Sequence, residues 1–131
     1  MLKRIKTTQI NLYNCDSPIM CSVEEAENFL SELVKEIGMN LIPEEITNCK
    51  NPKAFDFETS KVNLSEEEAG ITGVVTLYES HIAIHTWTKT KPCNAAIVVI
   101  SSCKDYDHGK TANWIVNKLK ADIYKVKFIE M

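Results

Sequence analysis

The sequence predicts an α+β fold, a two-layer sandwich in which two helices cover one face of an antiparallel sheet. Two segments have the apolar spacing of amphipathic helices, and several shorter runs alternate in polarity or are continuously apolar, as strands are. With 131 residues, of which 44% are hydrophobic, the chain can bury one compact core. We therefore expect a single domain over residues 1–131.

The first part of the chain is predicted to form a strand, a helix and a second strand. Residues 4–14 are rich in β-branched and alternating residues, which is typical of a strand. Ser22, followed three residues later by Glu25, resembles a capping box that begins a helix, and Gly38 would end it. The segment near 39–47 is the next expected strand. The apolar positions of the helix are Ala26, Phe29, Leu30, Leu33 and Ile37.

The rest of the chain is predicted to add a loop, four strands and a second helix. Residues 48–65 are polar and contain Pro52, so we expect a loop that could hold a short edge strand. The nearly continuous apolar run from 95 predicts a central, well-buried strand. Asp107 begins a helix with Ala112, Ile115, Val116 and Leu119 on its buried stripe. The strands predicted here are Gly70 to Leu77, His81 to Trp87, Ala95 to Ser102 and Ile123 to Ile129.

Charge and composition argue against several classes of protein. The formal net charge of -3 does not favour a nucleic-acid partner, because neutralising phosphates needs a positive field. The basic start over 1–6 is not followed by the apolar segment of a signal peptide. No stretch approaches the roughly 20 apolar residues of a membrane helix. We therefore expect a cytoplasmic protein with neither a nucleic-acid nor a membrane partner.

The five cysteines favour neither a metal site nor a disulfide framework. Their number is odd and no two of them form a C-x-x-C pair, so reduced thiols are the expected state. No metal is expected. The cysteines are Cys15, Cys21, Cys49, Cys93 and Cys103.

Residues 78–87 are the most informative segment of the chain. They read Tyr-Glu-Ser-His-Ile-Ala-Ile-His-Thr-Trp, which crowds polar groups into a run that otherwise alternates like a strand. Such groups reduce stability unless they are exposed or used. The segment resembles the Glu-Ser-His-Ile-x-Ile-His-Thr-Trp processing sequence of the S-adenosylmethionine decarboxylase family, in its short prokaryotic form. Members of that family are self-cleaving pyruvoyl enzymes of polyamine biosynthesis.

The resemblance implies that the chain is cut between Glu79 and Ser80, giving a β chain 1–79 and an α chain 80–131. Serine suits this reaction because its hydroxyl is both the nucleophile and the oxygen that is later eliminated. Ser80 would become a pyruvoyl cofactor. That group forms a Schiff base with the amine of a substrate and accepts the electrons released by decarboxylation, as pyridoxal phosphate does.

Cys103 is the proton donor that the resemblance implies. The family carries its donor cysteine in a Thr-Cys-Gly sequence at the end of the following strand, and Ser102-Cys103-Lys104 matches that place. Ser102 would take the position instead if the register were shifted by one residue.

Thr72 and His85 are implied to act in self-cleavage. Thr72, within a Gly-Ile-Thr-Gly sequence, matches a hydroxyl residue that aids processing in the family, and His85 matches the processing base. Five residues of straight strand span roughly 16 Å, so His85 cannot reach its own Ser80. In a hairpin that turns at 78–79, Thr72 and His85 would instead form a cross-strand pair. We expect them to act on a second copy, with the uncovered sheet face paired in a homodimer or larger oligomer that shares its active sites.

Two positions depart from the family pattern and leave the substrate open. A glutamate that binds the ribose of S-adenosylmethionine in the family is replaced by Lys89, which cannot accept hydrogen bonds. An aromatic residue that stacks on adenine is replaced by Glu66. The acidic run at 66–68 could hold a cationic tail, although Lys89 would repel it if it faced the pocket.

The sequence therefore leaves three hypotheses about the function open. The first is a self-processing, pyruvoyl-dependent decarboxylase that acts on S-adenosylmethionine. The second is the same chemistry on arginine or ornithine, which Glu66 and Lys89 would favour. The third is an uncleaved regulatory paralogue. The retention of four residues argues against it: Glu79, Ser80, His85 and Cys103.

Overall fold

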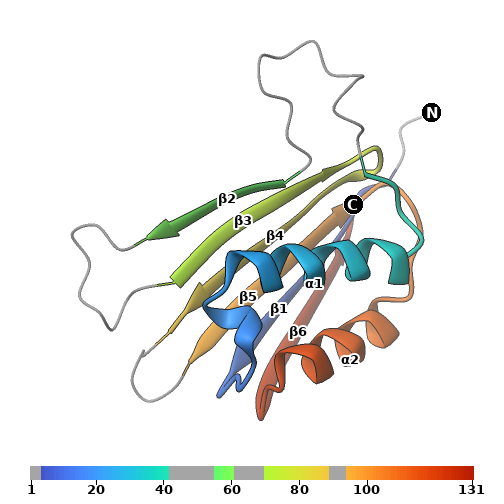
Figure 1. The fold of residues 1–131 in the computed structure, drawn as a ribbon. Coiled ribbons are helices and arrows are strands. Elements are labelled where there is room, and N and C mark those ends of the chain that lie inside the picture. The colour runs from blue at the N-terminus through green and yellow to red at the C-terminus, as the bar shows by residue number, and fades with distance from the viewer. Residues whose placement is uncertain (1–3, 42–54, 61–69, 89–93) are drawn as a thin grey trace.

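The structure, a computed structural model, describes residues 4–41, 55–60, 70–88 and 94–131. Six strands form one sheet in the order β2-β3-β4-β5-β1-β6, and every neighbouring pair is antiparallel (Figure 1). The strands are β1 (Lys6–Tyr13), β2 (Phe55–Ser60), β3 (Gly70–Leu77), β4 (Ser80–Trp87), β5 (Ala95–Ser102) and β6 (Ile123–Glu130). The helices are α1 (Val23–Glu36), α2 (His108–Leu119) and the 3-10 turn η1 (Pro18–Met20).

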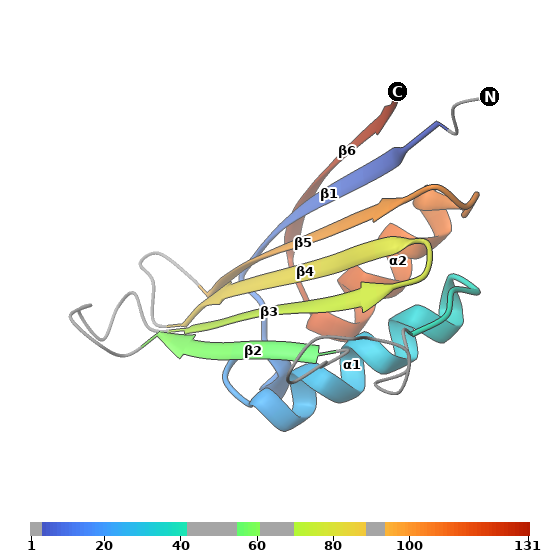
Figure 2. The ribbon, with the colours of Figure 1, turned by 90° about the horizontal axis from the view of Figure 1, so that it is seen from above.

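Both α-helices lie on the same side of the sheet, as Figure 2 shows, which confirms the predicted two-layer α+β architecture. Ser22 caps α1, because its hydroxyl accepts the N–H of Glu25 at 3.3 Å. Asp107 caps α2 in the same way through the N–H of Lys110 at 3.1 Å. No described helix is long and apolar enough to cross a membrane.

The core lies between the helices and the inner face of the sheet. The buried stripe of α1 is the predicted one, with Val34 added. The sheet contributes alternate residues of its central strands, as period-2 geometry requires. Fully buried examples are Ile10, Leu12, Val75, Ile82, Ile84, Val98 and Ile100.

Two of the predicted strands differ from the structure. β5 is central, but only every second residue is buried and its other face is half-exposed, so the predicted deep burial on both sides is wrong for a single chain. Its apolar outer residues are covered by no described element. Within the strand expected near 39–47, Leu41 forms only an isolated bridge to Leu77, and residues 42–47 lie outside the described residues. The short edge strand expected within 48–65 is β2.

Candidate active site

The hairpin between β3 and β4 turns at Tyr78 and Glu79, as the sequence predicts. Ser80 follows with a φ of 146°, a backbone conformation that glycine tolerates and other residues rarely adopt. Such a residue costs on the order of 1–3 kcal/mol and persists only where its surroundings hold it. The Glu79–Ser80 bond therefore lies next to a strained residue.

The carbonyl of Glu79 is held by the end of β5. The backbone N–H of Cys103 donates to the Glu79 oxygen at 3.0 Å. Ser102 lies opposite Ser80 in the sheet register. The side chain of Ser102 is buried, and its hydroxyl accepts the N–H of Lys104 at 2.9 Å. Of the two residues that the sequence left open, Cys103 is therefore half-exposed next to this bond, whereas Ser102 closes a turn.

The hydroxyl of Ser80 contacts a histidine that the sequence reasoning did not select. Its Oγ lies 3.1 Å from Nδ1 of His81. Neighbouring side chains on a regular strand point to opposite faces, so alternation alone would separate these two. The unusual φ of Ser80 accompanies their approach, and no sequence pattern signals it.

Thr72 and His85 form the cross-strand pair that the sequence predicts. Their Cα positions are partners in the β3–β4 ladder, and Thr72 Oγ1 lies 3.3 Å from His85 Nδ1. The ring of His85 also stacks on Trp87, with 6.2 Å between ring centroids. This pair lies on the sheet face away from the helices, five residues along β4 from Ser80. The structure thus brings Glu79, Ser80 and Cys103 together and leaves Thr72 and His85 as a separate group.

The carboxylate of Glu79 is bound by Asn40, which follows α1. The Asn40 backbone N–H donates to Oε1 at 3.0 Å and its side-chain amide donates to Oε2 at 3.2 Å. Burial opposes ionisation of this carboxyl, but the two hydrogen bonds from Asn40 and the charge of Lys104 outweigh it and hold the pKa of Glu79 below its usual value. Asn40 lies 39 residues from Glu79 in the chain, so no local pattern could indicate the contact.

Thr86 in the same motif has a structural role. It is buried, its hydroxyl donates to the Met20 carbonyl at 2.7 Å, and the same oxygen accepts the Ile71 N–H at 2.9 Å. Gly70 lies against this strand so closely that a Cβ there would be 1.7 Å from the Thr86 carbonyl oxygen. Only glycine allows that approach.

Two predicted substrate-binding residues, Glu66 and Lys89, lie outside the described residues. Among the residues that the structure describes, no group of three or more His, Cys, Asp or Glu side chains could hold a metal ion. Among the described cysteines, Cys21 and Cys103 are free thiols.

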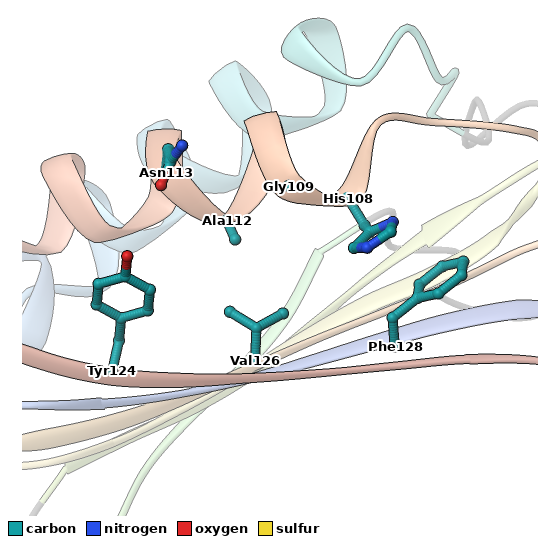
Figure 3. Close-up of a pocket in the computed structure, with 7 residues that line it drawn as sticks. All are labelled: His108, Gly109, Ala112, Asn113, Tyr124, Val126 and Phe128. Atoms are coloured by element: carbon teal, nitrogen blue, oxygen red, sulfur yellow. The ribbon is translucent and has the colours of Figure 1, made fainter.

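A pocket of about 410 Å³ between α2 and β6 is separate from these residues (Figure 3). Its side chains come from the two elements, and the ring of His108 stacks on Phe128 with 3.9 Å between centroids. None of the sequence-predicted site residues lines it.

Comparisons with known proteins agree with the fold and the motif. The family model described as S-adenosylmethionine decarboxylase matches residues 6–130. A protein from Sulfurisphaera tokodaii named S-adenosylmethionine decarboxylase proenzyme is 31% identical over 117 residues, which is 88% of this chain and 79% of that protein. A proenzyme of the same name from Thermococcus onnurineus is 32% identical over 97 residues, 67% of each chain.

A solved structure supports the fold independently. The adenosylmethionine decarboxylase from Aquifex aeolicus superposes with a TM-score of 0.72, covering 98% of this chain and 91% of that one at 22% sequence identity. The matches place the protein among the decarboxylases. The chain belongs to the S-adenosylmethionine decarboxylase family. None of these comparisons supports the arginine, ornithine or regulatory-paralogue hypotheses.

Proposed function

We propose that this protein is a pyruvoyl-dependent decarboxylase that acts on S-adenosylmethionine and that cuts itself between Glu79 and Ser80. The observation that carries the proposal is the geometry of that bond. Ser80 has a φ of 146°, and the carbonyl oxygen that precedes it already accepts the N–H of Cys103 at 3.0 Å. A strained serine beside a polarised carbonyl suits an internal acyl transfer.

The first step would move the Glu79 acyl group from nitrogen to oxygen. Ser80 Oγ attacks the Glu79 carbonyl carbon, the C–N bond breaks, and the freed amine takes up a proton. Negative charge develops on the Glu79 oxygen during the attack, and the Cys103 N–H is already directed at it. His81 holds the Ser80 hydroxyl at 3.1 Å and so keeps the nucleophile close to the turn.

The second step would convert the ester into the cofactor. A base removes the Ser80 Cα proton, the Cβ–O bond breaks, and the main-chain carboxylate of Glu79 leaves as the new C-terminus of chain 1–79. The remaining dehydroalanine becomes an imine, and water hydrolyses it to the pyruvoyl group and ammonia. We assign the base to His85 of a second copy, oriented by its hydrogen bond to Thr72.

When formed, the pyruvoyl group supplies the electron sink for loss of carbon dioxide. The side chain of Cys103 would then deliver a proton to the substrate carbon. Its backbone N–H, 3.0 Å from the Glu79 carbonyl oxygen beside the bond that is cut, supports this role. The free thiols fit a reducing compartment, so we propose a cytoplasmic location. The polyamine pathway is the setting that the family relationship favours.

Intact mass spectrometry of freshly purified protein tests the proposal. We expect two chains, 1–79 and 80–131, with the second blocked by a pyruvoyl group. Ser80→Ala should give one unbroken chain with no release of carbon dioxide from carboxyl-labelled S-adenosylmethionine. A wild-type chain that stays whole would overturn self-processing. A cleaved chain that releases carbon dioxide from labelled arginine or ornithine instead would overturn the substrate assignment.

A further inference from the structure

Asn40 is bound to the turn around the Glu79–Ser80 bond from the helix side. Its N–H and side-chain amide both donate to the Glu79 carboxylate, and its carbonyl accepts the N–H of Tyr78 at 3.1 Å. Next to it, Leu41 bridges to Leu77 at the end of β3. One residue thus makes hydrogen bonds to both residues of the hairpin turn.

The segment that carries Asn40 is itself held by a contact just before it, at Gly38. Gly38, which follows the C-cap of α1, has a φ of 69°, and its carbonyl accepts a hydrogen bond from the ammonium of Lys104. Lys104 stands where the family pattern has glycine, directly after Cys103. Glu79 in the turn therefore accepts hydrogen bonds from two segments. Asn40 donates to its side-chain carboxylate, and Cys103 donates to its main-chain carbonyl.

We propose that Asn40 is a positioning residue for self-cleavage. By holding the carboxylate of Glu79, it fixes the rotation of the peptide unit between Glu79 and Ser80, so that the carbonyl carbon stays within reach of Ser80 Oγ. This inference rests on the proposed function and adds to it a residue that lies outside the processing motif. Orientation of reacting groups is a large part of the rate of intramolecular reactions.

The test follows cleavage in pulse-labelled, cell-free synthesised full-length chain. Asn40→Ala should slow cleavage about tenfold, the typical effect of losing a hydrogen bond to a charged group. Asn113→Ala is the matched control, because this exposed asparagine on α2 makes the same chemical change far from the turn. It should cleave at the wild-type rate. Equal rates for the two variants would overturn the proposal.

A paired substitution separates positioning from general stability. Asn40→Asp alone places two carboxylates together and should cleave slowest. Adding Glu79→Gln restores one donor and one acceptor at the side-chain contact, and should recover most of the lost rate. The unfolding temperatures of these variants, measured in an uncleavable Ser80→Ala background, should not follow the order of their cleavage rates. Failure of the pair to recover, or cleavage that simply follows the unfolding temperature, would contradict the assignment.

Hydroxylamine identifies the affected step, because it splits esters and leaves amides intact. If Asn40 acts on the acyl transfer, no ester accumulates and hydroxylamine adds no fragments to Asn40→Ala. Extra fragments would place the defect after the transfer and overturn the proposal. Wild-type chain that never cleaves would overturn the proposed function together with this inference, whereas cleaving wild type with an unaffected Asn40→Ala contradicts the inference alone.

Discussion

Cys103 meets the turn through its backbone N–H, a contact that any residue other than proline would keep. Its two proposed contributions can therefore be separated by one substitution. Cys103→Ala should cleave at Glu79–Ser80 at close to the wild-type rate, because the N–H remains. Its turnover should fall by about 100-fold or more, the usual contribution of a positioned acid. Mass spectrometry and carbon dioxide release measure the two effects, and normal turnover would defeat the assignment of the thiol as proton donor.

The surroundings of Glu79 predict that the stability of the fold depends on pH. Its pKa is lowered in the folded chain, because the Asn40 hydrogen bonds and the charge of Lys104 outweigh burial. The ionised carboxylate therefore stabilises the fold above its unfolded pKa of about 4.3, and this stabilisation is lost as the pH falls through the folded pKa.

This pH dependence can be measured by comparing the unfolding temperatures of Ser80→Ala and of the same variant carrying Glu79→Gln, because neither chain can be cleaved. Their unfolding temperatures should differ most near neutral pH and converge in acid. A difference that stays constant across the titration would mean that the charge of Glu79 contributes nothing.

At the scale of elements, Thr86 joins three of them. Its hydroxyl links β4 to Ile71 of β3 and to Met20 of η1 within the buried layer. Thr86→Val keeps the shape but leaves a buried N–H and a buried carbonyl without their partner. We expect a loss of about 2 kcal/mol in the free energy of unfolding, measured with urea in the Ser80→Ala background. Thr7→Val, on the outer sheet face, is the control, and equal losses would argue against a special role for Thr86.

The elements also show which features of the fold and the site can be predicted from the sequence. Periodicity predicts both helices and their caps, and the position of the turn predicts the pairing of Thr72 with His85 because both are equally far from it. The contacts of Asn40 with Glu79 and of Ser80 with His81 could not be predicted. The first joins residues 39 positions apart, and the second accompanies a single unusual backbone angle. The burial of the outer face of β5 depends on whether a second layer covers it, and the sequence of a single chain does not indicate this.

At the scale of the whole molecule, the outer sheet face explains why we propose a dimer. Thr72 and His85 lie there, and no described element covers it. Two copies packed face to face would supply the missing layer and bring His85 of one to Ser80 of the other.

Mixing two inactive variants tests this arrangement. His85→Ala alone should remain uncleaved, and so should Ser80→Ala. Co-expressed, the Ser80→Ala chain should supply its His85 to the His85→Ala chain, whose cleavage then returns. Analytical ultracentrifugation should find the mixed species as a dimer or larger. Full cleavage of His85→Ala by itself would show that the base lies within one chain.

The strand order gives the proposed cut a consequence beyond chemistry. The piece 1–79 would contain β1, β2 and β3, and the piece 80–131 would contain β4, β5 and β6. Across the sheet the strands of the two pieces interleave: β2 and β3 lie beside β4 and β5, and β1 of the first piece is flanked on both sides by strands of the second. Separating the pieces would require breaking three hydrogen-bonded ladders at once. A break in the covalent chain would therefore leave the molecule assembled, and the new chain end would stay where it was made, although no covalent bond retains it.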